Sequence, residues 1–197
     1  MSTVSCWTYR WLDVVEQPAR QKRVQTANLF NMENPQSVAG IIFSPDRAEV
    51  LLILRRDVPV WVLPGGGIEP NETAEQAIVR EILEETGLTV KIDRLVGRYY
   101  PLNRLTKRTL LYACTATAGK LEISDETRGI KFVPLTALPK MPPPYAEWIH
   151  DAMVHVEPVS KDISSVTYLK LVGYLLTHPI LVTRFLLARA GLTINSR

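Results

Sequence analysis

The sequence predicts an α/β protein in which a mixed β-sheet lies between two helices, an α/β/α sandwich, with a C-terminal helical extension. Three observations support this fold class. Runs of residues with high β propensity occur on both sides of a capped helix over residues 73–87. A second helical pattern follows the proline run at 142–144, and residues 164–190 are unusually apolar. Strands mixed with two helices on opposite sides of one sheet form a sandwich.

The chain is predicted to divide into three parts. Residues 1–36 form an N-terminal extension, residues 37–157 form the α/β domain, and residues 158–197 form the C-terminal extension. The N-terminal part holds several aromatic side chains, which we expect to pack on the domain or on a partner subunit. Its basic residues are interpreted as a solvated face.

Several short strands are predicted in the α/β domain. Each is bounded by turn signals such as Ser44-Pro45-Asp46. The predicted strands span residues 37–43, 50–55, 58–63, 90–100, 109–117 and 130–133. The capped helix falls between the third and the fourth of them, so we expect it to cover one face of the sheet.

Both ends of that helix carry terminal signals. Thr73 followed three residues later by Gln76 is a capping-box pattern. Gly87 can adopt the left-handed conformation that ends many helices. Between these ends most residues are good helix formers, and Ile78 and Ile82 form an apolar stripe that should pack.

Three acidic side chains share one face of the same helix. At about 100° per residue, Glu81, Glu84 and Glu85 lie within an arc of roughly 100°. Like charges at this spacing destabilise a helix unless a cation lies among them. Carboxylate oxygens are hard ligands, so the predicted ion is Mg²⁺ or Mn²⁺. The glycine-rich turn at residues 64–67 would let backbone carbonyl groups approach that ion closely.

A second helix is predicted after the proline run at 142–144, because proline is favoured in the first helical turn. Apolar residues then recur at helical spacing, and we expect them to pack on the opposite face of the sheet. They are Tyr145, Trp148, Ile149, Ala152 and Val156.

The apolar segment over residues 164–190 is interrupted by Lys170, His178-Pro179 and Arg184. Pro179 is predicted to split it into two short helices, so it is not expected to span a bilayer. We favour a helical hairpin that packs on the domain or at a homodimer interface. An element that docks on a partner or on a membrane surface is the open alternative.

Composition is that of an ordinary globular chain, with 46% hydrophobic and 22% charged residues in 197. The net charge of +3 favours a polyanionic small molecule, but the charge is not clustered as in a dedicated nucleic-acid binder. Cys6 and Cys114 lack CxxC spacing and are interpreted as free structural thiols. We find no secretory signal pattern, and the expected location is cytoplasmic.

The acidic helix and the turn before it resemble the Nudix box of the Nudix hydrolases at every specified position. The matching pattern is Gly66, five residues, Glu72, seven residues, Arg80-Glu81-Ile82, one residue, Glu84-Glu85, one residue and Gly87-Leu88. Residues from about 37 to 156 look like the rest of that domain. The resemblance implies the same α/β/α sandwich and a hydrolase that acts on phosphoanhydride bonds.

The resemblance also implies roles for the motif residues. Glu84 and Glu85 would be the main metal ligands, and a carbonyl group of Gly65 or Gly66 would add another. Glu81 would bind metal or act as the base.

Residues around these acids have implied roles as well. Glu72 and Arg80 look like the pair that fixes the loop against the helix. Several Nudix proteins carry an additional acidic ligand or base at a downstream loop position, for which Glu126 is the candidate. Asp125 and Glu122 are its alternatives.

Two basic groups are candidates for contacts with substrate. Arg55 and Arg56 end a strand, and guanidinium groups make forked contacts with phosphate. Alternation along the strand predicts that only one of them points inward, while Gly65 and Gly66 would approach the substrate through their backbone. A second basic group either grips substrate or faces water, and it comprises Arg104, Lys107 and Arg108.

The predicted reaction is direct hydrolysis by water held on metal. A covalent route is not indicated, because the chain lacks a G-x-S-x-G elbow and its three histidines are scattered. The expected substrate is a nucleoside diphosphate linked to another group, of the ADP-ribose or nucleotide-sugar type. A free or oxidised nucleoside triphosphate is the alternative. A non-catalytic nucleotide-sensing module is a further alternative, although such modules commonly lose the catalytic acids that this chain retains.

Overall fold

The computed structural model describes residues 35–177, 183 and 187. The predicted N-terminal extension, residues 1–36, lies outside the described residues apart from Pro35 and Gln36. The second helix of the predicted C-terminal hairpin also lies outside the described residues, apart from Thr183 and Leu187.

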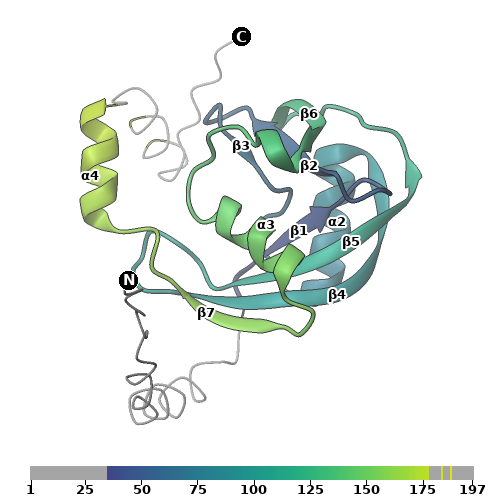
Figure 1. The fold of residues 1–197 in the computed structure, drawn as a ribbon, viewed down its shortest axis with the longest axis horizontal. Helices are drawn as coiled ribbons and strands as arrows, with labels where there is room; N and C mark the ends of the chain where they lie inside the picture. Colours follow the sequence, from purple (N-terminus) through teal and green to yellow (C-terminus); the bar gives the residue numbers. More distant parts are fainter. Residues whose placement is uncertain (1–34, 178–182, 184–186, 188–197) are drawn as a thin grey trace, which may run out of the picture. The chain divides into compact units, whose positions relative to one another are not determined.

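The strands form two sheets (Figure 1). In the four-stranded sheet, β5 lies between a parallel neighbour, β1, and an antiparallel neighbour, β4, and β7 pairs with β4 in parallel. Its strands are β1 (Ser37–Ile42), β5 (Thr109–Gly119), β4 (Leu88–Pro101) and β7 (Val159–Ile163). The three-stranded sheet is antiparallel, with order β3 (Trp61–Val62), β2 (Glu49–Arg55) and β6 (Thr127–Pro134).

Helices α2 (Ala74–Thr86) and α3 (Tyr145–Val154) pack on opposite sides of these strands (Figure 1). Successive residues of a strand point to opposite faces, so β1 and β2 contribute to two separate cores. The core under α2 contains Val38, Ile42, Leu51, Ile78 and Ile82, and the core under α3 contains Ala39, Ile41, Leu52, Trp148 and Ile149. The predicted α/β/α class is therefore confirmed.

The predicted ends of α2 are present. The Thr73 hydroxyl accepts a hydrogen bond from the Gln76 N–H at 3.2 Å, and the Gln76 side chain accepts one from the Thr73 N–H at 2.9 Å. Gly87 has φ 73° and donates its N–H to the Leu83 carbonyl group. These caps determine where the helix that carries the acids begins and ends.

Two predicted elements are shorter in the structure. The strand expected over 58–63 is only Trp61–Val62, since Pro59 has no N–H to donate to a ladder. The second helix ends at Val154, and Val156, expected on its apolar stripe, is 81% exposed. Arg94 donates to the carbonyl group of Ala152 in the last turn and to that of Val156 beyond the helix, which stabilises this helix end without a further turn.

Strand β7 was not predicted. It lies within the segment 158–197 that the sequence assigned to the C-terminal extension, and it pairs with the last residues of β4. Its sequence, Val-Ser-Lys-Asp-Ile, has two charged residues in five, which is a weak strand signal but suits an edge strand. The sheet therefore continues past the predicted domain boundary.

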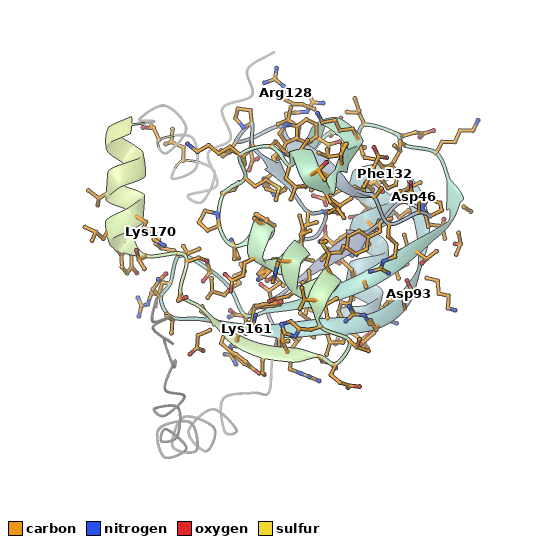
Figure 2. The ribbon with its side chains drawn as sticks, in the orientation of Figure 1. Asp46, Asp93, Arg128, Phe132, Lys161 and Lys170 are labelled. Carbon is orange, nitrogen blue, oxygen red and sulfur yellow. The ribbon has the colours of Figure 1, made fainter. Side chains whose placement is uncertain are left out.

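A buried carboxylate joins α3 to this edge of the sheet. Asp151 is 1% exposed and accepts hydrogen bonds from the Tyr99 hydroxyl at 2.8 Å and from Lys161 Nζ at 2.6 Å. Figure 2 labels Lys161 on β7. His155 Nε2 lies 3.7 Å from the same carboxylate.

We expect Asp151→Ala to lower the free energy of unfolding by roughly 2–4 kcal/mol, because it leaves a buried hydroxyl and an ammonium group without their partner. Urea denaturation measures this loss. Asp162→Ala, which removes the exposed acid next to Lys161, is the matched control and should change stability by less than about 0.5 kcal/mol. Equal effects of the two substitutions would contradict the buried network.

Helix α4 (Tyr168–Thr177) follows β7 and corresponds to the first helix of the predicted hairpin. Thr167 stabilises its start, because its hydroxyl accepts a hydrogen bond from the Lys170 N–H at 3.3 Å. Among the described residues, no helix has the length and apolar character needed to cross a membrane.

Candidate functional site

The glycine-rich turn lies against the edge of β1. The Val38 N–H donates to the Gly66 carbonyl group at 2.9 Å, and the Gly40 N–H donates to the Pro64 carbonyl group at 2.8 Å. Gly65 has φ 147°, and a Cβ there would collide with the Val38 carbonyl oxygen. Only glycine fits at residue 65, so the turn is held at one distance from the strand.

Glu85 is the most deeply buried acid of the predicted site. It is 3% exposed, and one of its carboxylate oxygens accepts a hydrogen bond from the Gly65 N–H at 2.7 Å. Burial raises the pKa of Glu85 to about 8, and the negative charges of Glu81 and Glu126 act in the same direction. The Gly65 hydrogen bond and the positive charge of Arg55 oppose this rise only in part. The surroundings of Glu85 therefore destabilise its charged form unless a cation lies beside it.

Arg80 connects the loop to the acidic helix. Its guanidinium group makes a forked pair with Glu72, at 2.8 and 3.0 Å, and donates to the Gly67 carbonyl group at 3.1 Å. The same group lies 3.1 Å from Glu81 and 3.0 Å from Glu84. The hydrogen bond from Arg80 is the main reason why the pKa of Glu72 is lowered.

We expect Arg80→Lys to weaken metal-dependent turnover by roughly 10–100-fold, because a single ammonium group cannot make the forked pair with Glu72 and still contact the other acids. Titration of activity against Mg²⁺ concentration measures the effect. The change should appear chiefly as a higher Mg²⁺ requirement. Unchanged Mg²⁺ dependence would show that Arg80 does not position the acids.

Glu81 and Glu84 differ in their surroundings. The Glu81 side chain is 13% exposed, and burial raises its pKa, although Arg80 opposes the rise. The Glu84 side chain is 59% exposed. A Cβ on Gly66 would occupy the position of the Glu81 carboxylate, so the missing side chain at residue 66 makes the space that this acid fills.

Glu126 lies in the loop that precedes β6, near the same acids. Its negative charge contributes to the raised pKa of both Glu81 and Glu85. Arg56 holds this loop: its N–H donates to the Glu126 carbonyl group at 2.9 Å, and its guanidinium group donates to the Thr127 carbonyl group at 2.9 Å. The alternative Glu122 lies past the far end of α2, where its N–H bonds the Thr86 carbonyl group.

The two candidate phosphate clamps have different partners. Arg56 faces the loop carbonyl groups, whereas Arg55 lies within electrostatic reach of Glu85 and Tyr145. Asp57, which the sequence analysis did not single out, orients Arg55 through two hydrogen bonds of 2.9 and 2.6 Å. An acid two residues after a strand-ending arginine is the signal that could have indicated it.

Tyr145 is a second residue near the site that the sequence analysis placed only in the core. It packs edge-on against Trp148 with ring centroids 5.5 Å apart. Burial raises the pKa of its hydroxyl group, and the charge of Glu85 adds to this rise. The first residue of α3 thus faces both the core and the acidic site.

As the side chains stand, the described residues contain no group of three or more His, Cys, Asp or Glu side chains arranged to hold one ion. Arg80 contacts both Glu81 and Glu84. The donor set nevertheless fits a divalent cation. It combines a buried carboxylate of raised pKa, two further acids with mutually unfavourable charges, and a glycine turn open to close approach.

The raised pKa of Glu85 predicts how stability depends on pH. Its pKa is about 8 in the folded chain against an ordinary value of 4.5, so the folded state holds the proton more tightly. This stabilisation is complete below pH 4.5 and is lost as pH rises through about 8. We therefore expect the Tm of the metal-free protein to decrease as the pH rises from 4.5 to about 8. Each unit of pKa shift corresponds to at most about 1.4 kcal/mol.

Added Mg²⁺ should raise the Tm more at pH 8 than at pH 5, because a carboxylate must lose its proton before it binds metal. Thermal unfolding with EDTA or Mg²⁺ at both pH values tests this expectation. A Glu85→Gln variant should lose most of the pH dependence. Equal Mg²⁺ effects at the two pH values would contradict a carboxylate ligand.

Comparison with known proteins identifies the family. The family model for the NUDIX domain matches residues 33–153, more than half of the chain. The chain belongs to the Nudix hydrolases. This Nudix chain therefore acts on phosphoanhydride bonds, in agreement with the sequence prediction.

Relatives of this Nudix chain include proteins with different named substrates. A Bacillus subtilis (strain 168) protein, provisionally named 8-oxo-dGTP diphosphatase, is 37% identical over 101 residues, covering 51% of this chain and 68% of that protein. An ADP-ribose pyrophosphatase of Methanocaldococcus jannaschii is 35% identical over 123 residues, covering 59% of this chain and 72% of that protein.

The fold of this Nudix chain also matches solved structures. The crystal structure of an ADP-ribose pyrophosphatase from Streptococcus suis superposes with a TM-score of 0.54 at 22% identity. The match covers 66% of this chain and 99% of that one. At this identity the likeness establishes the fold alone.

Proposed function

We propose that this Nudix hydrolase is a Mg²⁺-dependent pyrophosphohydrolase that cleaves a nucleoside diphosphate linked to another group, of the ADP-ribose or nucleotide-sugar type. The observation that carries the proposal is the buried Glu85 carboxylate, which faces the glycine turn beside two further acids. The name of the M. jannaschii relative, ADP-ribose pyrophosphatase, supports this substrate class.

Glu85, Glu84 and a carbonyl group of Gly65 or Gly66 would hold the ion, with Glu81 and Glu126 beside it. The Gly66 carbonyl group already accepts one hydrogen bond from Val38, which leaves it one lone pair for this purpose. A bound Mg²⁺ supplies charge neutralisation for the diphosphate and lowers the pKa of a water molecule. Mn²⁺, which takes the same ligands, is expected to substitute.

The chain's own side chains would supply the remaining steps. Arg55, oriented by Asp57, would bind a phosphate oxygen of the substrate. Glu81 or Glu126 would accept the proton of the attacking water, since each lies near the buried acid and neither is as deeply enclosed as Glu85. Burial of Glu85 keeps bulk water away from one side of the site.

A free or oxidised nucleoside triphosphate is the second candidate substrate, and the B. subtilis relative favours it. A sensing module without turnover is less well supported, because each acid of the motif is present and Glu81 interacts electrostatically with both Glu84 and Glu85.

A panel of nucleotides assayed with Mg²⁺, Mn²⁺ or EDTA tests the proposal. We expect ADP-ribose or a nucleotide sugar to give a nucleoside monophosphate and a sugar phosphate, with no turnover in EDTA. Preferred cleavage of 8-oxo-dGTP to a monophosphate and pyrophosphate would indicate a nucleoside triphosphate substrate in place of the ADP-ribose or nucleotide-sugar type. Tight nucleotide binding without any product would favour the sensor.

A further inference from the structure

We infer that α4 and the loop between β4 and β5 form a docking surface for an anionic lipid bilayer. The helix presents apolar side chains to solvent. Tyr168, Leu169 and Val172 are 55%, 83% and 52% exposed. At about 100° per residue these three fall within one arc of about 100°, so they form a single apolar face, the α4 face. Membrane-surface helices bury such a face at the boundary between headgroups and acyl chains.

The segment before α4 is tied to a basic loop of the domain. Asn103 Nδ2 donates to the Val166 carbonyl group at 2.7 Å, two residues before the helix begins. The loop over residues 102–108 carries an exposed Leu102 beside the exposed Arg104 and Lys107, and Arg108 follows. An exposed apolar side chain between cations is the pattern expected of a loop that meets anionic headgroups.

Acidic residues are missing from both segments. No Asp or Glu occurs between Asp93 and Glu122, and none occurs after Asp162. The chain has 23 basic and 20 acidic residues, and four of the basic ones follow Asp162. Residues 1–162 therefore carry one net negative charge and residues 163–197 carry four positive charges. Of the four basic residues that follow Asp162, Lys170 lies in α4 and the other three lie outside the described residues.

The lack of acidic residues in both segments indicates which partner fits the α4 face. An anionic bilayer offers both an apolar layer and a negative surface, and each Lys or Arg near that surface strengthens binding. A second copy docked through the same two segments would offer their basic residues no negative charge, because neither segment contains Asp or Glu. Lys170, labelled in Figure 2, donates a hydrogen bond from Nζ to the Ser165 carbonyl group at 3.2 Å. This bond holds its charge near the first residues of α4.

Flotation of the full-length chain with vesicles tests the inference. We expect binding to vesicles of phosphatidylcholine with phosphatidylglycerol, and at least about tenfold weaker binding to phosphatidylcholine alone. Leu169→Glu/Val172→Glu should reduce binding at least about tenfold, because two aliphatic side chains are lost from the apolar layer. Val156→Glu, which changes a valine that is 81% exposed elsewhere on the domain, is the control and should bind as the parent chain does.

A variant of the basic loop separates the electrostatic contribution to membrane binding from the apolar contribution. Arg104→Ala/Lys107→Ala should weaken binding to the anionic vesicles by roughly 30-fold and leave the weak binding to neutral vesicles unchanged. Nucleotide hydrolysis by the Leu169→Glu/Val172→Glu variant should equal that of the parent chain in the absence of vesicles. The membrane inference thus succeeds or fails separately from the proposed enzyme activity.

Three results would overturn the inference. The first is equal binding to anionic and neutral vesicles, and the second is full binding by the Leu169→Glu/Val172→Glu variant. The third is no binding to either vesicle. If the parent chain is then a dimer that the same variant converts to a monomer, the α4 face serves self-association.

Discussion

Replacing Glu85 by Gln should lower kcat by at least about a hundredfold and leave the fold intact. Loss of an outer-shell partner of a metal ligand already costs about 10–100-fold, and Glu85 would be a ligand itself. The neutral amide has nearly the same shape, and burial already favours the uncharged carboxyl group, whose pKa is about 8. The variant should therefore be at least as stable as the parent in EDTA at pH 8. Single-turnover hydrolysis and thermal unfolding measure the two effects.

Glu147→Gln is the matched control for this experiment, because it neutralises an exposed acid on α3. It should change neither the activity nor the pH dependence of stability appreciably. Full activity of Glu85→Gln would remove Glu85 from the proposed ligand set. A strong loss of stability at pH 8 would instead show that its buried charge is compensated by the protein alone.

Replacing Gly66 by Ala should lower activity by roughly 10–100-fold with little loss of stability. The new Cβ would occupy the position of the Glu81 carboxylate, which lies at the end of a flexible side chain and can move away. The fold then survives while the acid is displaced from the site, and displacing a group that supports a metal site costs about this factor. Steady-state kinetics at several Mg²⁺ concentrations, together with urea denaturation, separate the two effects.

Gly67→Ala is a close control for this substitution. A Cβ at residue 67 meets nothing within 4 Å, and its backbone is not in the left-handed region. We expect Gly67→Ala to retain activity within a factor of about three, because the carbonyl group that accepts the Arg80 hydrogen bond stays and the new methyl group meets no neighbour. If both alanine variants lost activity equally, the effect would come from stiffening of the turn and not from Glu81.

Local features of the fold were predictable from sequence because they depend on neighbours in the chain. The Thr73–Gln76 capping box and the Gly87 helix end need only residues within one or two helical turns, and both are present. The end of α3 was not predictable in this way, because Arg94, which lies on β4, donates to the Ala152 carbonyl group in its last turn. Strand β7 was not predictable, because an edge strand needs few apolar residues and its sequence therefore carries only a weak strand signal.

The candidate site likewise has features that depend on neighbours in the chain and features that depend on the tertiary structure. Spacing along one helix already places Glu81, Glu84 and Glu85 on a common face, whatever the rest of the chain does. Which of two consecutive arginines interacts with the acids depends on the tertiary structure, in which the charge of Arg55 acts on Glu85. The proximity of Glu126 depends on a loop that Arg56, directly after β2, holds through hydrogen bonds to the Ser124 and Thr127 carbonyl groups.

The sequence by itself determined the residue types of the site, their order, and the helix and turn that carry them. Only the tertiary structure decided that Glu85 is buried against Gly65 while Glu84 stays exposed, although the two are neighbours in the chain. The reason is that desolvation depends on everything that surrounds a side chain, and strands distant in sequence provide those surroundings. Helical spacing can place a carboxylate on a face, but only packing can raise its pKa to about 8.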